Sequence, residues 1–206
     1  AIANLTITPE RQKIVDFIDP LAKNVEEIVV TGPTSETVTK LEDLAGREVW
    51  VRPSSSYRQS LEKLNRSLEE QGLEKVVIRD ADERLATEDL LEMVNAGLLP
   101  VTVADGYLVD LWSEIFEKIV PASDLPLRTG GQLAWATRKG SPQLARVLNK
   151  WGKGHKQGTL MGNILIKRYL EDATFVRNAF SEDNVTRYQD TVGYFQKYAG
   201  EYDFDT

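Results

Sequence analysis

The sequence predicts an α/β fold in which mostly parallel strands alternate with flanking helices. Between residues 47 and 116, a short strand rich in β-branched or aromatic residues is followed three times by a polar loop and an amphipathic helix. Such alternation is typical of parallel sheets joined by right-handed crossovers. These crossovers bring the strand-to-helix loops to the carboxyl edge of the sheet, which is the usual binding edge of open α/β folds.

Composition limits the function classes. The chain has 206 residues, enough for one or two small domains, and its hydrophobic content of 41% is ordinary for a globular protein. The net charge of −7 argues against a nucleic-acid partner, which requires clustered Lys and Arg. The absence of cysteine excludes disulfides, thiolate catalysis and zinc–thiolate sites. No run of apolar residues is long enough to span a bilayer.

The first residues predict the end of a strand that runs into a capped helix. Thr8 is a good N-cap and Pro9 suits the first helical position, whereas Asp19 and Pro20 interrupt the element. Because the sequence begins inside a strand-to-helix unit, we expect a further N-terminal portion in the natural protein. Residues 26–31 predict another strand, and the Gly-Pro turn at 32–35 predicts a hinge.

Residues 49–57 (Val-Trp-Val-Arg-Pro-Ser-Ser-Ser-Tyr) predict a covered strand that Pro53 ends. One of the three serines is a natural N-cap for the helix predicted over 57–71, which Gly72 closes. Free backbone N–H groups and hydroxyls at such a helix start suit a carboxylate or phosphate. From these residues alone, an ordinary N-cap and an anion site both remain open.

The next units place acidic side chains at strand ends. A strand over 75–79 leads to Asp80 and Asp82, and a helix follows over 87–95. The covered strand 98–105 ends at Asp105 and enters a further helix. Because the carboxyl ends of parallel strands share one edge, we expect these aspartates to lie on the same rim as the serines.

The last part of the chain predicts a second crossing between lobes. A polar loop over 122–131 precedes a strand over 132–137 and a helix that starts near Pro142. The glycine-rich stretch 152–159 lacks the ending of a phosphate loop and does not follow a strand, so we do not expect it to bind phosphate. His155 has no nearby ligand or nucleophile in the sequence, so no catalytic or metal role is expected for it. An amphipathic helix is expected within 179–206.

Two segments carry a resemblance to a known family. Residues 5–20 (Leu-Thr-Ile-Thr-Pro-Glu-Arg, then Val-Asp-Phe-Ile-Asp-Pro) resemble the signature of family 3 extracellular solute-binding proteins, the periplasmic amino-acid receptors. The similarity continues through 41–57, 103–105 and 135–141 and covers most of residues 1–178. It implies a two-lobed, periplasmic-binding-protein-like (type II) fold whose first lobe is incomplete in this chain.

A narrower resemblance is to the membrane-bound lytic transglycosylase F family, carried by residues 95–105, 158–163 and 194–199. In that family a solute-binding-like domain precedes a peptidoglycan-cleaving domain. The resemblance implies a periplasmic module, associated with the outer membrane only through other parts of the protein, and no catalytic residue, cofactor or metal in this chain.

The family resemblance also implies a ligand site. Arg11 would grip a ligand α-carboxylate beside Thr6, with Ser55 and Ser56 adding donors from the opposite lobe, and Asp105 would pair with the α-ammonium. The implied lobe boundaries are 1–35 and 125–178 for lobe 1, 36–124 for lobe 2, and 179–206 for a linker toward a catalytic domain. The implied function is binding of an amino acid, peptide or cell-wall fragment. Alternatives are a free receptor of an ABC transporter and an enzyme similar to cyclohexadienyl dehydratase.

Overall fold

The computed structural model describes residues 4–170, 174, 186, 191, 192 and 197–199. Residues 1–171 form one compact unit and residues 172–206 a second. The helix expected within 179–206 therefore lies almost entirely outside the described residues. Among the residues described, none of the helices combines the length and apolar character that crossing a bilayer requires.

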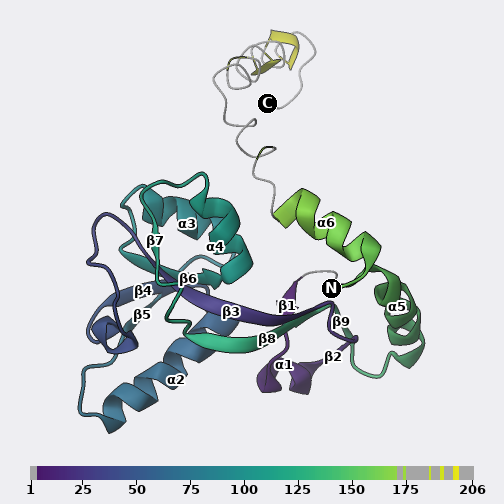
Figure 1. Cartoon of the computed structure of the whole chain (residues 1–206), viewed down its shortest axis with the longest axis horizontal. Helices are drawn as coiled ribbons and strands as arrows, with labels where there is room; N and C mark the ends of the chain where they lie inside the picture. The colour runs from purple at the N-terminus through teal and green to yellow at the C-terminus, as the bar shows by residue number, and fades with distance from the viewer. Residues whose placement is uncertain (1–3, 171–173, 175–185, 187–190, 193–196, 200–206) are drawn as a thin grey trace. The chain divides into compact units, whose positions relative to one another are not determined.

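The larger sheet of the first unit has the strand order β1-β8-β3-β6-β4-β5, with β7 paired to β3 (Figure 1). Its strands are β1 (Leu5–Thr6), β3 (Ala22–Thr31), β4 (Glu48–Val51), β5 (Val77–Asp80), β6 (Val101–Asp105), β7 (Val120–Pro121) and β8 (Arg128–Ala134). A small second sheet pairs β2 (Val15–Phe17) with β9 (Ala136–Arg138).

The predicted parallel alternation is present in β6, β4 and β5, which pair in parallel. The strands β3, β8, β1 and β7 pair antiparallel instead. The reason is that β3 and β8 are not members of strand–helix–strand units. They are long neighbours that run in opposite directions between the β4–β5–β6 region and the β2–β9 region (Figure 1). The predicted lobe boundaries fall just after β3 and just before β8, and the division into lobes stays a prediction.

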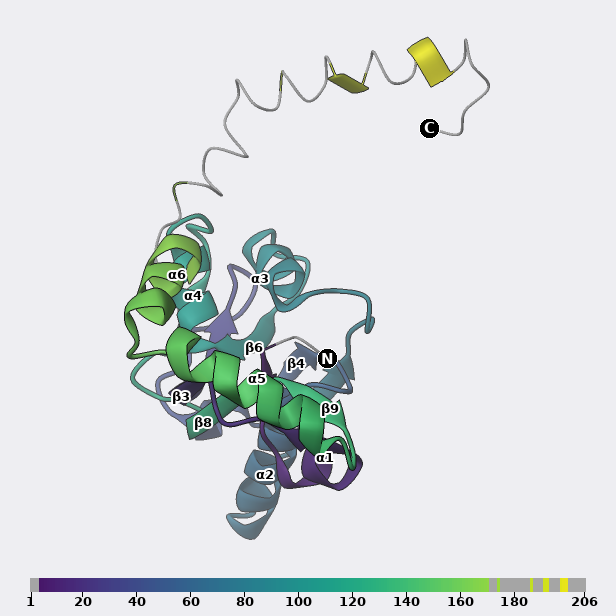
Figure 2. The same ribbon diagram turned by 90° about the vertical axis from the view of Figure 1, so that its right-hand side faces the viewer.

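The helices lie on both faces of the larger sheet. On one face is α2 (Ser56–Glu70), and on the other are α3 (Thr87–Asn95) and α4 (Gly106–Ser113), as Figures 1 and 2 both show. The remaining helical segments are α1 (Pro9–Ile14), the 3₁₀ turn η1 (Leu41–Leu44), α5 (Pro142–His155) and α6 (Leu160–Leu170). The bounds of α3 match the predicted 87–95, and Gly72 follows α2 with a φ of 72°, as expected of a C-terminal cap.

Alternation along β3 divides the core into two clusters. Ile28 and Val30 pack with residues of α3 and α4, whereas Val29 packs with residues of α2, β4 and β6 on the opposite face. All three side chains are almost completely buried. Glu27 lies on the same face of β3 as Val29, so its side chain lies on the face of the sheet that α2 covers. This placement positions the charged cluster described next.

Candidate functional site

Arg11 joins two segments that are far apart in the sequence. It lies in the first turn of α1, where Thr8 is the N-cap and accepts a hydrogen bond from the Arg11 backbone N–H at 3.3 Å. Its Nη1 donates to the Thr6 carbonyl at 2.9 Å, and its Nη2 donates to the Ser54 carbonyl at 2.8 Å. The planar guanidinium thus bridges the end of β1 and the loop between β4 and α2.

The three serines have different partners. Ser55 is the N-cap of α2, since its Oγ accepts from the Arg58 N–H at 3.4 Å. Ser56 donates from its Oγ to Thr6 Oγ1 at 3.2 Å, which gives a second link to β1. The Ser54 N–H and hydroxyl both donate to the Glu83 carboxylate. Ser55 serves as the ordinary helix cap, while Ser56 faces Thr6.

A row of three charged residues crosses the sheet beside this bridge. Glu27 of β3 pairs in register with Asp105 of β6 on one side and with Arg128 of β8 on the other. Both carboxylates are buried, with exposed fractions of 2% for Glu27 and 4% for Asp105. Glu27 Oε2 accepts a hydrogen bond from Ser60 of α2 at 2.5 Å, and Glu27 Oε1 lies 3.6 Å from Arg128 Nη1.

Asp105 occupies the N-cap position of α4, but its side chain makes no capping hydrogen bond. Its backbone N–H donates to the Tyr57 hydroxyl at 3.1 Å, and its Oδ1 is buried without a hydrogen-bond partner among the described residues. Burial, together with the neighbouring Glu27, raises the pKa of the Asp105 carboxyl to about 7, although hydrogen bonds from Tyr57 and Tyr107 oppose the rise. The carboxyl is therefore poised between charged and neutral forms.

The Arg11 guanidinium and the Tyr57 and Tyr107 hydroxyls keep their usual charge states. Burial lowers the pKa of the Arg11 guanidinium, and the Glu27 charge partly offsets this effect. Arginine nevertheless remains protonated in proteins. Burial, with the charge of Asp105, raises the pKa of the Tyr57 and Tyr107 hydroxyls, which consequently stay neutral and able to donate.

The residues predicted for the site therefore fall into two connected groups. Thr6, Arg11 and Ser56 are in direct contact, with Ser55 capping the adjacent helix. Asp105 and Arg11 share no hydrogen bond or ion pair, but the charges of Glu27 and Arg128 act on both residues. The site assignment stays a prediction, but these positions share one face of the sheet.

The sequence did not predict Glu27, which is the cross-strand neighbour of Asp105. It also did not predict Arg128 and Ser60, which are the partners of Glu27. A signal for Glu27 was present, because it alternates with Val29 in a strand whose buried face is apolar. Arg128 and Ser60 carry no comparable signal, since each sits in a stretch that looks solvated.

The rim aspartates do not join the site. Asp80 pairs with Arg58, and Asp82 pairs with Arg84 at 2.6 Å. Asp80, Asp82 and Arg84 are exposed, while the Arg58 side chain is partly buried. Ion pairs at exposed positions contribute little to stability.

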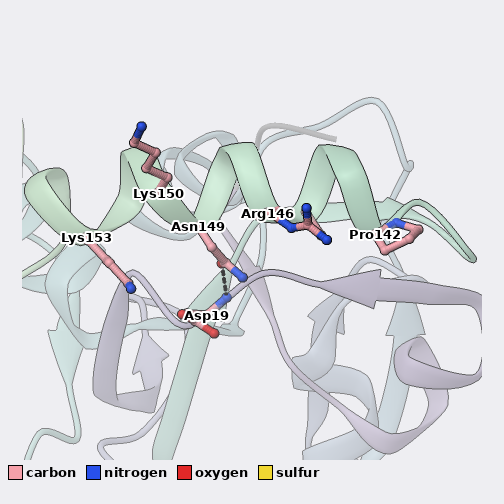
Figure 3. Close-up of a pocket in the computed structure, with 7 residues that line it drawn as sticks. Asp19, Pro142, Arg146, Asn149, Lys150 and Lys153 are labelled. Carbon is pink, nitrogen blue, oxygen red and sulfur yellow. Dashed lines mark hydrogen bonds between the residues drawn. The ribbon is translucent and has the colours of Figure 1, made fainter.

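Two cavities lie near this charged cluster, and Tyr107 also lines the larger one. One of about 460 Å³ lies between α5 and the Asp19 turn, where Asn149 Oδ1 accepts from the Asp19 N–H at 2.7 Å and Arg146 and Lys153 line the wall (Figure 3). The other, of about 670 Å³, is bordered by β3, α4, α5 and α6. His155 borders it and stacks on Trp151 with centroids 4.0 Å apart. The described residues contain no group of three or more His, Asp or Glu side chains that could hold a metal.

Comparison with known proteins identifies the family. The model of bacterial extracellular solute-binding proteins, family 3, matches residues 1–170. The chain belongs to this family. The solved structures that it matches include an ancestral arginine-binding protein bound to arginine, with a TM-score of 0.64 and 22% identity, covering 82% of this chain and 70% of that one. A substrate-binding protein of an amino-acid ABC transporter matches with a TM-score of 0.66 and 20% identity, over 83% and 70%. At these identities the likeness shows the fold alone.

The curated relatives of this solute-binding chain carry the name membrane-bound lytic murein transglycosylase F. The protein from Desulfosudis oleivorans is 28% identical over 173 residues, which cover 84% of this chain and 36% of the relative. The protein from Methylobacillus flagellatus is 30% identical over 175 residues, which cover 84% and 35%. The chain thus spans about a third of the length of these relatives.

Proposed function

We propose that this chain is a periplasmic binding module for a small zwitterionic ligand, namely an amino acid, a peptide or a cell-wall fragment. The observation that carries the proposal is the Asp105 carboxyl, which is buried, released from capping α4 and left with an unpartnered Oδ1. A buried carboxylate is stable when a cation pairs with it. A ligand ammonium is such a cation, and Arg11 is the complementary fork for the ligand carboxylate.

The curated relatives support a regulatory setting for this binding. We infer that the module controls an attached peptidoglycan-cleaving domain and is itself without catalytic residues, and that any membrane association arises from other parts of the protein. A free receptor for an ABC transporter is the second candidate, because structural neighbours of this type bind amino acids. An enzyme similar to cyclohexadienyl dehydratase is the third. Another structural neighbour is an ancestral amino-acid-binding protein described as a precursor of that enzyme, at 23% identity.

Isothermal titration calorimetry of the 206-residue chain tests the proposal. The ligands are the common L-amino acids, D-alanyl-D-alanine and a disaccharide peptide released from peptidoglycan. We expect at least one of them to bind, and we expect Arg11→Ala and Asp105→Ala each to weaken binding at least tenfold. Arg84→Ala is the matched control, since this arginine is 90% exposed and pairs only with Asp82 among the described residues.

Three outcomes distinguish the candidate functions. Binding that survives both site substitutions would remove the zwitterion site. Dehydration of prephenate or arogenate by the chain would establish the enzyme instead. Preference for free amino acids over the disaccharide peptide would favour the transporter receptor.

A further inference from the structure

Glu27 is a second buried carboxylate that the recognition of a simple zwitterion does not require. It sits in the middle of β3 and faces Asp105 directly across the antiparallel pair with β6. Side chains directly opposite each other in such a pair lie on one face of the sheet, with Cβ atoms about 4.5–5.5 Å apart. Two carboxylates at this separation repel each other when both are ionised.

The partners of the two carboxylates are unequal. Glu27 receives the Ser60 hydroxyl at 2.5 Å and has the Arg128 guanidinium 3.6 Å away. Asp105 has no comparable ion pair among the described residues, although each of the two carboxylates has one buried oxygen without a hydrogen bond there. The negative charge is thus compensated at Glu27, which leaves Asp105 as the member of the pair that holds a proton.

We propose that Glu27 makes ligand uptake at this site an exchange of a proton for a cationic group. In the ligand-free site at mildly acidic pH, the Asp105 carboxyl holds a proton. When an ammonium or similar cation enters, the carboxyl O–H bond breaks, the proton passes to solvent, and the carboxylate pairs with the cation, which keeps its own protons. Glu27 acts as a positioning residue that holds the proton on Asp105. This inference rests on the proposed binding function.

Each element packed around Asp105 contributes a group that faces it or its partner. These groups are Glu27 from β3, Arg128 from β8, Tyr57 and Ser60 from α2, Tyr107 from α4, and Arg11 from α1, which acts on the cluster through Glu27 and Arg128. Of the groups that act on the Asp105 carboxyl itself, only Glu27 adds a negative charge, whereas Glu88 of α3 acts on the neighbouring Tyr107. Replacing Glu27 should therefore have the largest effect on the pKa of the Asp105 carboxyl.

The exchange predicts a specific dependence of affinity on pH. With the Asp105 carboxyl pKa near 7 in the free site, close to one proton should be released per bound molecule at pH 6 and about one tenth at pH 8. Affinity should rise about tenfold per pH unit below pH 6 and level off above pH 8.

The first test needs no ligand. The Asp carboxyl carbons are labelled with ¹³C and titrated by NMR, and the Asp105 signal is assigned by its loss in Asp105→Asn. We expect a midpoint near 7 in the unsubstituted chain and at least one unit lower in Glu27→Gln, which keeps an acceptor for Ser60. Glu26→Gln, at the adjacent exposed position of β3, should leave the midpoint unchanged. Arg128→Gln should raise the midpoint, so it tests the same balance if Glu27→Gln fails to fold. A titration midpoint that is shifted neither by Glu27→Gln nor by Arg128→Gln would overturn the proposal.

The second test measures the proton directly. Calorimetry with L-glutamine and L-arginine, in two buffers of different ionisation enthalpy at pH 6 and pH 8, gives the number of protons released per bound amino acid. We expect release at pH 6, far less at pH 8, and little at either pH in Glu27→Gln. Binding without proton release would overturn the exchange and leave the binding function intact. Failure of both probes and of every ligand in the panel above would overturn the binding function itself.

Discussion

Replacing Asp105 by asparagine should change how the stability of the ligand-free protein depends on pH. Asparagine has nearly the same shape as the protonated carboxyl but cannot ionise. The pKa of the Asp105 carboxyl is about 7 in the folded chain and 3.8 in the unfolded one. A raised pKa in an acid means that the folded state holds the proton more tightly between these two values. The contribution is therefore fully present below pH 3.8 and is lost as pH rises through 7.

The magnitude follows from the separation of the two pKa values. Each unit corresponds to about 1.4 kcal/mol, so the whole effect is about 4 kcal/mol, of which about 2 to 3 kcal/mol falls between pH 5 and pH 8. The free energy of unfolding of the unsubstituted chain should fall by this amount relative to that of Asp105→Asn over the same range. The variant should consequently be the more stable protein at pH 8.

Urea unfolding at pH 5, 6, 7 and 8, followed by tryptophan fluorescence, measures the difference. Asp110→Asn is the control, because this neighbouring aspartate of α4 is exposed and its replacement should leave the slope with pH unchanged. Parallel curves for the unsubstituted chain and Asp105→Asn, within about 0.5 kcal/mol at every pH, would refute the argument that burial beside Glu27 holds a proton on Asp105.

Three further predictions concern the surrounding contacts. Arg11→Lys keeps the charge but cannot hold both the Thr6 and Ser54 carbonyls, so urea unfolding should show a loss of about 1 kcal/mol and calorimetry a loss of tenfold or more in ligand affinity. Ser60→Ala leaves the buried Glu27 carboxylate without its hydroxyl donor and should cost about 1.5–3 kcal/mol of unfolding free energy, whereas Ser67→Ala at an exposed position of α2 should cost under 0.5 kcal/mol. Leu91→Ala, at a fully buried position between α3 and the sheet, should lower the unfolding free energy by about 2–5 kcal/mol, and a loss below 1 kcal/mol would contradict the described core.

The sequence predicted elements whose structure depends on local pattern. The bounds of α3 follow from apolar spacing, and the cap of α2 follows from the serine run after Pro53. It did not predict that β8 begins at Arg128, because Arg-Thr-Gly-Gly has the composition of a loop. Pairing with β3 makes it a strand, and the close approach requires glycine, since a Cβ at Gly131 would lie 2.7 Å from the Val25 carbonyl oxygen.

The same limit applies to the site. Arg11 and the serines were predicted through a family resemblance, which records pairings between distant segments that spacing cannot reveal. The Glu27–Asp105 and Glu27–Arg128 neighbours depend on strand register, which the sequence of any single segment leaves open. A strand over 26–31 was predicted, but neither the inward orientation of Glu27 nor its partners were predicted.

If Arg11 binds a ligand as proposed, its contacts would couple ligand binding to the approach of distant segments. In the described structure its guanidinium donates to two neutral carbonyls, one beside β1 and one beside α2, and so holds these segments together. A ligand carboxylate must compete with these carbonyls, and it adds a negative charge and a bidentate geometry that two separate neutral acceptors lack. Binding of the carboxylate to Arg11 is favourable only if the displaced carbonyls of Thr6 and Ser54 find other hydrogen-bond donors. Thr6 and Ser56, linked at 3.2 Å across the same gap, keep the two segments in contact while Arg11 changes partners. Loss of the Thr6–Ser56 link should accordingly weaken ligand binding even though neither hydroxyl need touch the carboxylate.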